Sequence, residues 1–231
     1  MFSNFSKCFT LGALAILSVA AINTSAQGVT RGDFVRKNAA GGTTAAGGAT
    51  AKGPTGGTAA RGGVVATNGQ GGAVAAGGAA VKGPNGGTAA RGGYLATNGK
   101  GSGQSGSAGG FKAANGAQGS RQSSTQWNNG NVTHQGSAQA SGAKGSIQSS
   151  DSSQRSANGQ FSGQRSTTAT GANGGSYRGN TTYQNGSATH TTTATGKNGD
   201  TYTGTTTATK GQGVTHTGTC KDAGGNVIPC N

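Results

Sequence analysis

The chain has 231 residues, and its 18 lysines and arginines against four acidic residues give a formal net charge of +14. Glycine occupies 49 positions, and alanine makes up more than half of the 30% that are hydrophobic, so the chain cannot bury enough apolar area to order a compact domain of this size. We therefore expect no conventional globular core. Helix is disfavoured because Gly, Thr, Ser and Asn are poor helix formers, and collagen is excluded because glycine does not recur at every third position.

The N-terminal segment, residues 1–26, is typical of a secretory signal peptide. One lysine precedes an apolar run from Cys8 to Ile22, and small residues follow as far as Ala26. We expect cleavage after Ala26, with cleavage after Ala21 as the alternative. The apolar run is shorter than the roughly 20 residues that cross a bilayer, so we expect no membrane span in the mature chain. The expected location is secreted or at the cell surface, with the periplasm as a further option.

Three zones of different composition follow the signal peptide. Residues 27–40 form a short basic leader. Residues 41–110 are Gly/Ala-rich and carry a 30-residue repeat, since residues 51–70 and 81–100 are identical at 15 of 20 positions. Gly and Ala are depleted in strands, so we expect this zone to be partly disordered. Residues 111–231 are richer in Ser, Thr, Gln and Asn, and we expect them to form a β-repeat zone.

Asn-Gly or Lys-Gly pairs recur every 12 to 17 residues through both zones. Asn-Gly is the strongest short signal for a β-hairpin, because both residues tolerate positive φ. This interval sets the length of one structural unit, either a strand with its turn or one coil of a solenoid. The predicted fold class is therefore all-β, an elongated hairpin or solenoid-like array in the C-terminal half that follows a partly disordered N-terminal repeat zone.

Threonine occupies alternate positions in the last third of the chain. Period two is the period of a strand, so we expect these threonines to share one face, where each cross-strand Thr–Thr pair contributes roughly 0.2–1 kcal/mol. Such an array resembles the ice-binding faces of some antifreeze proteins, and the resemblance implies binding to ice. The threonines are Thr189, Thr191, Thr193, Thr195, Thr201, Thr203, Thr205, Thr207, Thr209, Thr215, Thr217 and Thr219.

Two cysteines, Cys220 and Cys230, remain when the predicted signal peptide is removed. An even pair in an exported chain favours a disulfide, and the Asp, Gly and Asn residues between them can turn the chain back. Closing so short a loop contributes on the order of 2–3 kcal/mol. We therefore predict a disulfide that keeps the last hairpin from fraying.

The basic residues are spread thinly, often one to a repeat. Even spacing in a repeat array would place them in rows, and such rows could bind acidic polysaccharide, lipopolysaccharide or DNA without sequence specificity. The alternative is that the charge keeps a Gly-rich chain soluble and prevents edge-to-edge pairing. The candidate contacts are Lys52, Arg61, Lys82, Arg91, Lys100, Lys112 and Arg121.

The sequence contains no paired carboxylates, no nucleophile motif and no cluster of metal ligands, so we expect neither an enzyme nor a cofactor. Composition and turn period resemble those of curli-type functional amyloid subunits, and the resemblance implies self-assembly. We therefore predict an exported structural, surface or extracellular-matrix repeat protein that associates with itself and with anionic polymers. The alternative is a soluble secreted module that binds acidic polysaccharide, extracellular DNA or ice.

Overall fold

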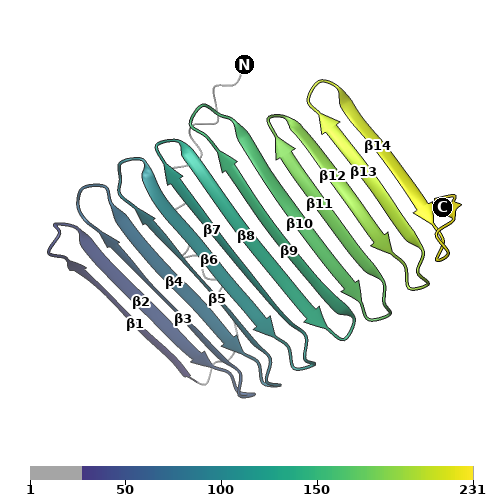
Figure 1. The fold of residues 1–231 in the computed structure, drawn as a ribbon. Helices are drawn as coiled ribbons and strands as arrows, with labels where there is room; N and C mark the ends of the chain where they lie inside the picture. The colour runs from purple at the N-terminus through teal and green to yellow at the C-terminus, as the bar shows by residue number, and fades with distance from the viewer. Residues whose placement is uncertain (1–27, 231) are drawn as a thin grey trace.

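The structure is a computed structural model that describes residues 28–230, so the predicted signal peptide and Gln27 lie outside the described residues. It forms one antiparallel sheet whose strands pair in chain order (Figure 1). The all-β prediction is confirmed, and the array is a row of consecutive hairpins in a single layer. The strands are β1 (Gly28–Lys37), β2 (Thr43–Lys52), β3 (Thr58–Thr67), β4 (Ala73–Lys82), β5 (Thr88–Thr97), β6 (Ser102–Lys112), β7 (Gln118–Asn128), β8 (Asn131–Gly142), β9 (Gly145–Arg155), β10 (Phe161–Gly171), β11 (Ser176–Gln184), β12 (Ser187–Thr195), β13 (Thr201–Thr209), β14 (Gly213–Lys221) and β15 (Val227–Ile228).

The sheet is not confined to the C-terminal half of the chain. The zone 41–110, for which the composition predicts partial disorder, holds β2 to β5 and most of β6, with the same antiparallel ladders as the rest. Low strand propensity is overridden here because every one of these strands has a hydrogen-bonded partner on both sides. Glycines also meet glycines in register, as in Gly47 opposite Gly63 and Gly48 opposite Gly62.

The turns follow the predicted rhythm but use more than one geometry. Asn129 and Asn185 have positive φ, 46° and 44°, and each is followed by a glycine of positive φ, as a two-residue hairpin turn requires. In the commoner geometry only the glycine has positive φ. The N–H of Gly56, for example, donates to the carbonyl of Gly53, with Pro54 in the first corner of the turn. The Lys-Gly pair at 52–53 therefore ends a strand and does not form the apex of the turn.

The 30-residue repeat corresponds to two strands and their turns. Residues that are 30 positions apart therefore lie on alternate strands, as β3 and β5 do. Neighbouring strands lie about 4.8 Å apart, so repeat-related side chains lie about 9.5 Å apart in a row across the sheet.

The strand register divides the side chains between two chemically different faces. Directly opposed residues share a face, so the register can be followed from strand to strand. We call one face the threonine face, since it carries all twelve predicted threonines, and the other the histidine face, since it carries His134, His190 and His216. From β7 to β14 the threonine face consists almost entirely of Ser, Thr, Gln and Asn. Most of the rings and arginines lie on the histidine face.

No apolar side chain is buried anywhere in residues 28–230. The chain exposes 16234 Å² of accessible surface, whereas a compact monomer of 22.0 kDa would expose roughly 9,300 Å². Backbone hydrogen bonds and cross-strand pairs therefore hold the sheet together, with no core beneath them. Function must be sought on the two edges and the two faces.

Candidate assembly edges and surface rows

The first edge of the sheet is β1, which pairs with β2 on one side and with no other described strand. All ten of its residues are exposed, including Val29 at 64% and Val35 at 72%. Arg36 lies over the ring of Phe34, with its guanidinium carbon 5.6 Å from the ring centroid. A long edge with open backbone donors and acceptors and apolar side chains is a template for another strand.

The second edge is β14, and it is only partly covered. The short strand β15 pairs with just Cys220 and Lys221, so Gly213–Thr219 has no partner on its outer side within the described chain. The predicted disulfide is confirmed, since Cys220 and Cys230 are bonded with their Cα atoms 5.4 Å apart. The disulfide thus fastens the C-terminal segment over one end of this edge, and we call this arrangement the C-terminal clasp.

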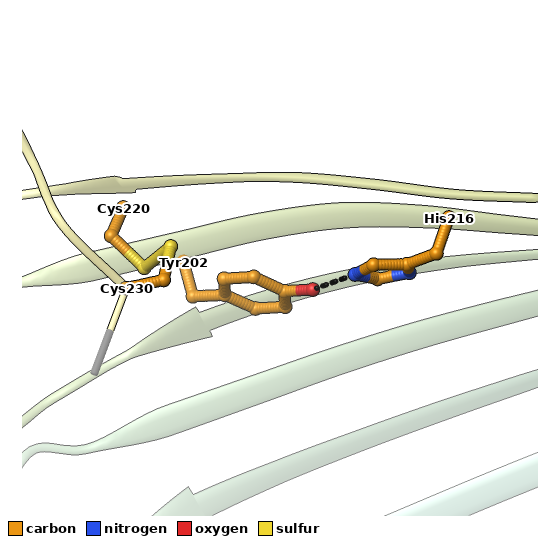
Figure 2. The surroundings of a disulfide bond; sticks show 4 residues. All are labelled: Tyr202, His216, Cys220 and Cys230. Atoms are coloured by element: carbon orange, nitrogen blue, oxygen red, sulfur yellow. Dashed lines mark hydrogen bonds between the residues drawn. A yellow bond between two sulfur atoms is a disulfide. The ribbon is translucent and has the colours of Figure 1, made fainter.

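Tyr202 lies beside the clasp on the histidine face (Figure 2). It is directly opposite Cys220, and its hydroxyl is 3.1 Å from Nε2 of His216. The ring passes over the opposed pair Gly204 and Gly218, and a Cβ at Gly218 would lie 2.9 Å from it. Glycine is therefore required at both positions, because the Tyr202 ring occupies the space that a side chain would fill. The ring and the histidine join β13 to β14 next to the exposed part of the edge, and the disulfide joins β14 to the segment that follows β15.

The twelve predicted threonines form a regular grid on the threonine face across β12, β13 and β14. Thr191, Thr205 and Thr217 are successive partners in one row, and the rows on either side repeat the pattern. Rows are about 6.7 Å apart along a strand, and strands are about 4.8 Å apart. Only Thr191, Thr209 and Thr215 have hydrogen-bonded hydroxyls within the described chain. Most of the hydroxyls therefore face solvent.

The predicted basic contacts separate into two rows on opposite faces. Lys52, Lys82 and Lys112 lie on the threonine face, each opposite Thr58 or Thr88. The arginines lie on the histidine face, and Lys100 lies in the turn between β5 and β6 and belongs to neither row. The arginine row is Arg31, Arg61, Arg91 and Arg121.

Arg31 is absent from the contacts predicted from sequence, although its 30-residue distance from Arg61 could have identified it. It differs from the other three arginines of the row in forming an ion pair, since its Nε lies 3.6 Å from Oδ1 of Asp33. Both side chains are largely exposed, so this pair contributes little to stability.

The histidines are held by hydroxyl groups. His190 accepts or donates hydrogen bonds at both ring nitrogens, to Thr181 at 2.7 Å and Thr192 at 2.8 Å. His134 has Thr125 at 2.8 Å on one side and Asp151 at 3.4 Å on the other, an acid that lies far from it in sequence. Within residues 28–230, no serine or cysteine is hydrogen-bonded to either ring. The contacts with Thr181, Thr125 and Asp151 join neighbouring strands.

Comparison with protein-family models, curated proteins and solved structures found no match at a significant level. Between residues 28 and 230 no three His, Cys, Asp or Glu side chains gather as potential metal ligands. The described part of the chain also contains no helix long and apolar enough to cross a bilayer. Its edges, its threonine grid and its basic rows are accordingly the features from which a function can be argued.

Proposed function

We propose that this protein is an exported structural protein of a cell surface or extracellular matrix, which assembles edge to edge into extended sheets. The observation that carries the proposal is a single-layer sheet with an open edge strand at each end, β1 and the Gly213–Thr219 part of β14. A disulfide is compatible with an oxidising location outside the cytoplasm.

The number of strands favours this mode of assembly. Strands alternate in direction, so β1 and β14 run opposite ways. A second copy placed by simple translation brings its β1 beside β14 of the first, and the antiparallel alternation continues without a break. Such a contact is head-to-tail and does not close on itself, so it leads to filaments or ribbons. Ribbons of this kind display the basic rows to anionic polymers over long distances.

Electron microscopy of the purified mature protein tests the proposal. We expect ribbons that grow with concentration and whose growth stops when excess peptide of the β1 sequence, Gly28–Lys37, occupies the β14 edge. The matched control is the same peptide with Arg31→Pro and Phe34→Pro, which removes a backbone donor from each of its sides and should leave growth unchanged. A protein that stays monomeric at all concentrations, or ribbons equally insensitive to both peptides, would contradict edge-to-edge assembly.

The threonine grid favours a second candidate function, binding to ice. Its hydroxyls are regularly spaced and mostly without protein partners. Cations on this face lie at the margin of the grid, where Arg178 is opposite Thr193 and Lys221 is opposite Thr201. We expect inhibition of ice recrystallisation that is lost in Thr205→Lys at the centre of the grid. The matched control, Ala208→Lys, places the same charge on the opposite face of β13 and should keep the effect. An unmodified protein without such inhibition excludes this function.

A further inference from the structure

The lysines of the threonine face form one rim of a groove across the first six strands. Lys52, Thr58, Lys82, Thr88 and Lys112 are successive cross-strand partners, so Lys and Thr alternate along the rim. The lysines occur on every second strand, which places their Cα atoms about 9.5 Å apart. All three lysine side chains are exposed.

The floor of this groove is made of small side chains. Next to the lysine rim run Thr50, Ala60, Ala80, Ala90 and Gly110, which are also successive partners across the strands. Rim and floor together line one continuous surface depression from β1 to β6. A linear polymer can therefore lie across the strands close to the backbone, with the ammonium groups along one side of it.

The charge around the groove is of one sign. The described part of the threonine face contains no carboxylate, because Asp33 and Asp151 lie on the histidine face and Asp200 and Asp222 lie in turns. Nothing on this face neutralises the lysines, so a groove with positive charge along its rim and a floor of small side chains concentrates anions along its length.

We infer that the groove binds a linear acidic polysaccharide carrying one carboxylate per disaccharide. This inference rests on the proposed role as a matrix or surface protein and adds the chemical class of its polymer partner. An extended disaccharide is about as long as the interval between the lysines, so one ammonium meets each carboxylate. The hydroxyls of Thr58 and Thr88, between the lysines, can exchange hydrogen bonds with sugar hydroxyls.

Nucleic acid fits the groove less well. Phosphates follow each strand of a DNA duplex at about 3.4 Å, so lysines at about 9.5 Å leave most of them unpaired. Single strands are bound largely by stacking of bases on aromatic rings, and no ring lies in the rim or floor rows. The polysaccharide is accordingly the occupant that the spacing and the side chains favour.

The test is a binding titration of full-length mature protein, kept below the concentration at which it assembles. The probes are hyaluronan oligosaccharides, with one carboxylate per disaccharide, then polygalacturonate, with one per sugar, neutral dextran, and single- and double-stranded DNA. We expect the tightest binding to hyaluronan, reversed by salt. The triple variant Lys52→Gln, Lys82→Gln, Lys112→Gln should weaken it about tenfold or more, and the corresponding Lys→Arg variant should restore it.

The matched control removes the same charge from the other face through Arg61→Gln, Arg91→Gln and Arg121→Gln, and it should keep nearly full affinity. Equal weakening by both triple variants would mean that general charge, and not the groove, binds the polymer. Tighter binding of DNA than of hyaluronan, or no binding of any anionic polymer, would also overturn the inference. Circular dichroism checks that both variants keep the sheet. Because binding is measured on the monomer, its failure would leave edge-to-edge assembly standing.

Discussion

The hydroxyl of Tyr202 lies 3.1 Å from Nε2 of His216, and the two residues join β13 to β14 on the histidine face. Nδ1 of the same histidine is 2.8 Å from the hydroxyl of Thr206, so both ring nitrogens have a partner on β13. The ring of Tyr202 lies over the opposed glycines Gly204 and Gly218. In a sheet without a core, a large ring gains contact area by lying flat over glycines, where no side chain is in the way.

The first prediction concerns Gly204. A methyl group there meets the Tyr202 ring and hydroxyl, so Gly204→Ala should lift the ring and loosen β13 from β14. Overpacking of this kind costs about 1–3 kcal/mol. We expect amide hydrogen exchange in β13 and β14 to speed up by roughly five- to thirty-fold, the factor that corresponds to one or two kcal/mol.

The control is Gly32→Ala, at a strand position where a Cβ meets nothing within 4 Å and the backbone conformation suits any residue. It should leave exchange in β13 and β14 unchanged. If the two variants behave alike, the ring is not held by the glycine pair, and Tyr202 is only another exposed side chain.

The second prediction concerns the C-terminal clasp. Closing its loop, in which the cysteines are separated by 10 positions, contributes roughly 2.5 kcal/mol in the chain-entropy account. Only two residues of β15 pair with β14, so this short pairing should not persist without the disulfide. The Cys220→Ser, Cys230→Ser variant should therefore free the whole outer side of β14 and shorten the lag before ribbons appear. A dye-binding time course measures the lag, and a lag that stays the same or lengthens would show that the clasp does not limit the edge.

The third prediction concerns Asp222, in the turn that leads into β15. Its carboxylate accepts hydrogen bonds from the Asn226 side-chain nitrogen at 3.0 Å and backbone N–H at 2.8 Å. The Asn226 side-chain bond, first among several, lowers the pKa of Asp222 below its ordinary value of 3.8. The pKa of Asp222 is lower in the folded than in the unfolded chain. The ionised carboxylate therefore stabilises the turn fully above the ordinary pKa, and this stabilisation is lost as the pH falls through the lowered pKa.

The Asn226 amide signal in an NMR titration reports on this turn. We expect it to move only below about pH 3.8, with a midpoint lower than that, and Asp222→Asn should abolish the transition. A midpoint at or above the ordinary value would show that the carboxylate does not hold the turn.

Much of the fold follows from short-range patterns in the sequence. Alternating threonines such as Thr203 and Thr205 predict a shared face, and the register puts them there because the side-chain period of a strand is two. The 30-residue repeat predicts rows of basic residues, and the rows exist. The cysteine pair predicts the disulfide that closes the last hairpin.

Other features depend on register and could not be read from one strand at a time. Lys52 and Arg61 look equivalent in sequence, yet one lies on each face. Lys52 is opposite Thr58, and Arg61 is three positions further along β3, an odd number that places it on the other face. The contact between His134 and Asp151 arises only when β8 and β9 pair. The order of the Gly/Ala-rich zone, residues 41–110, does not follow from its composition for a different reason. Residue propensity describes an isolated strand, whereas each strand here is held by two neighbours.

Hydrogen exchange before and after assembly tests edge-to-edge association most directly. Interior strands are already paired on both sides in the monomer, so their amides should change little when ribbons form. Amides on the outer sides of β1 and of Gly213–Thr219 should become protected, because only there do new backbone hydrogen bonds form. Ribbons in which neither edge gains protection would contradict the account, since they would have to be held together through the faces of the sheet.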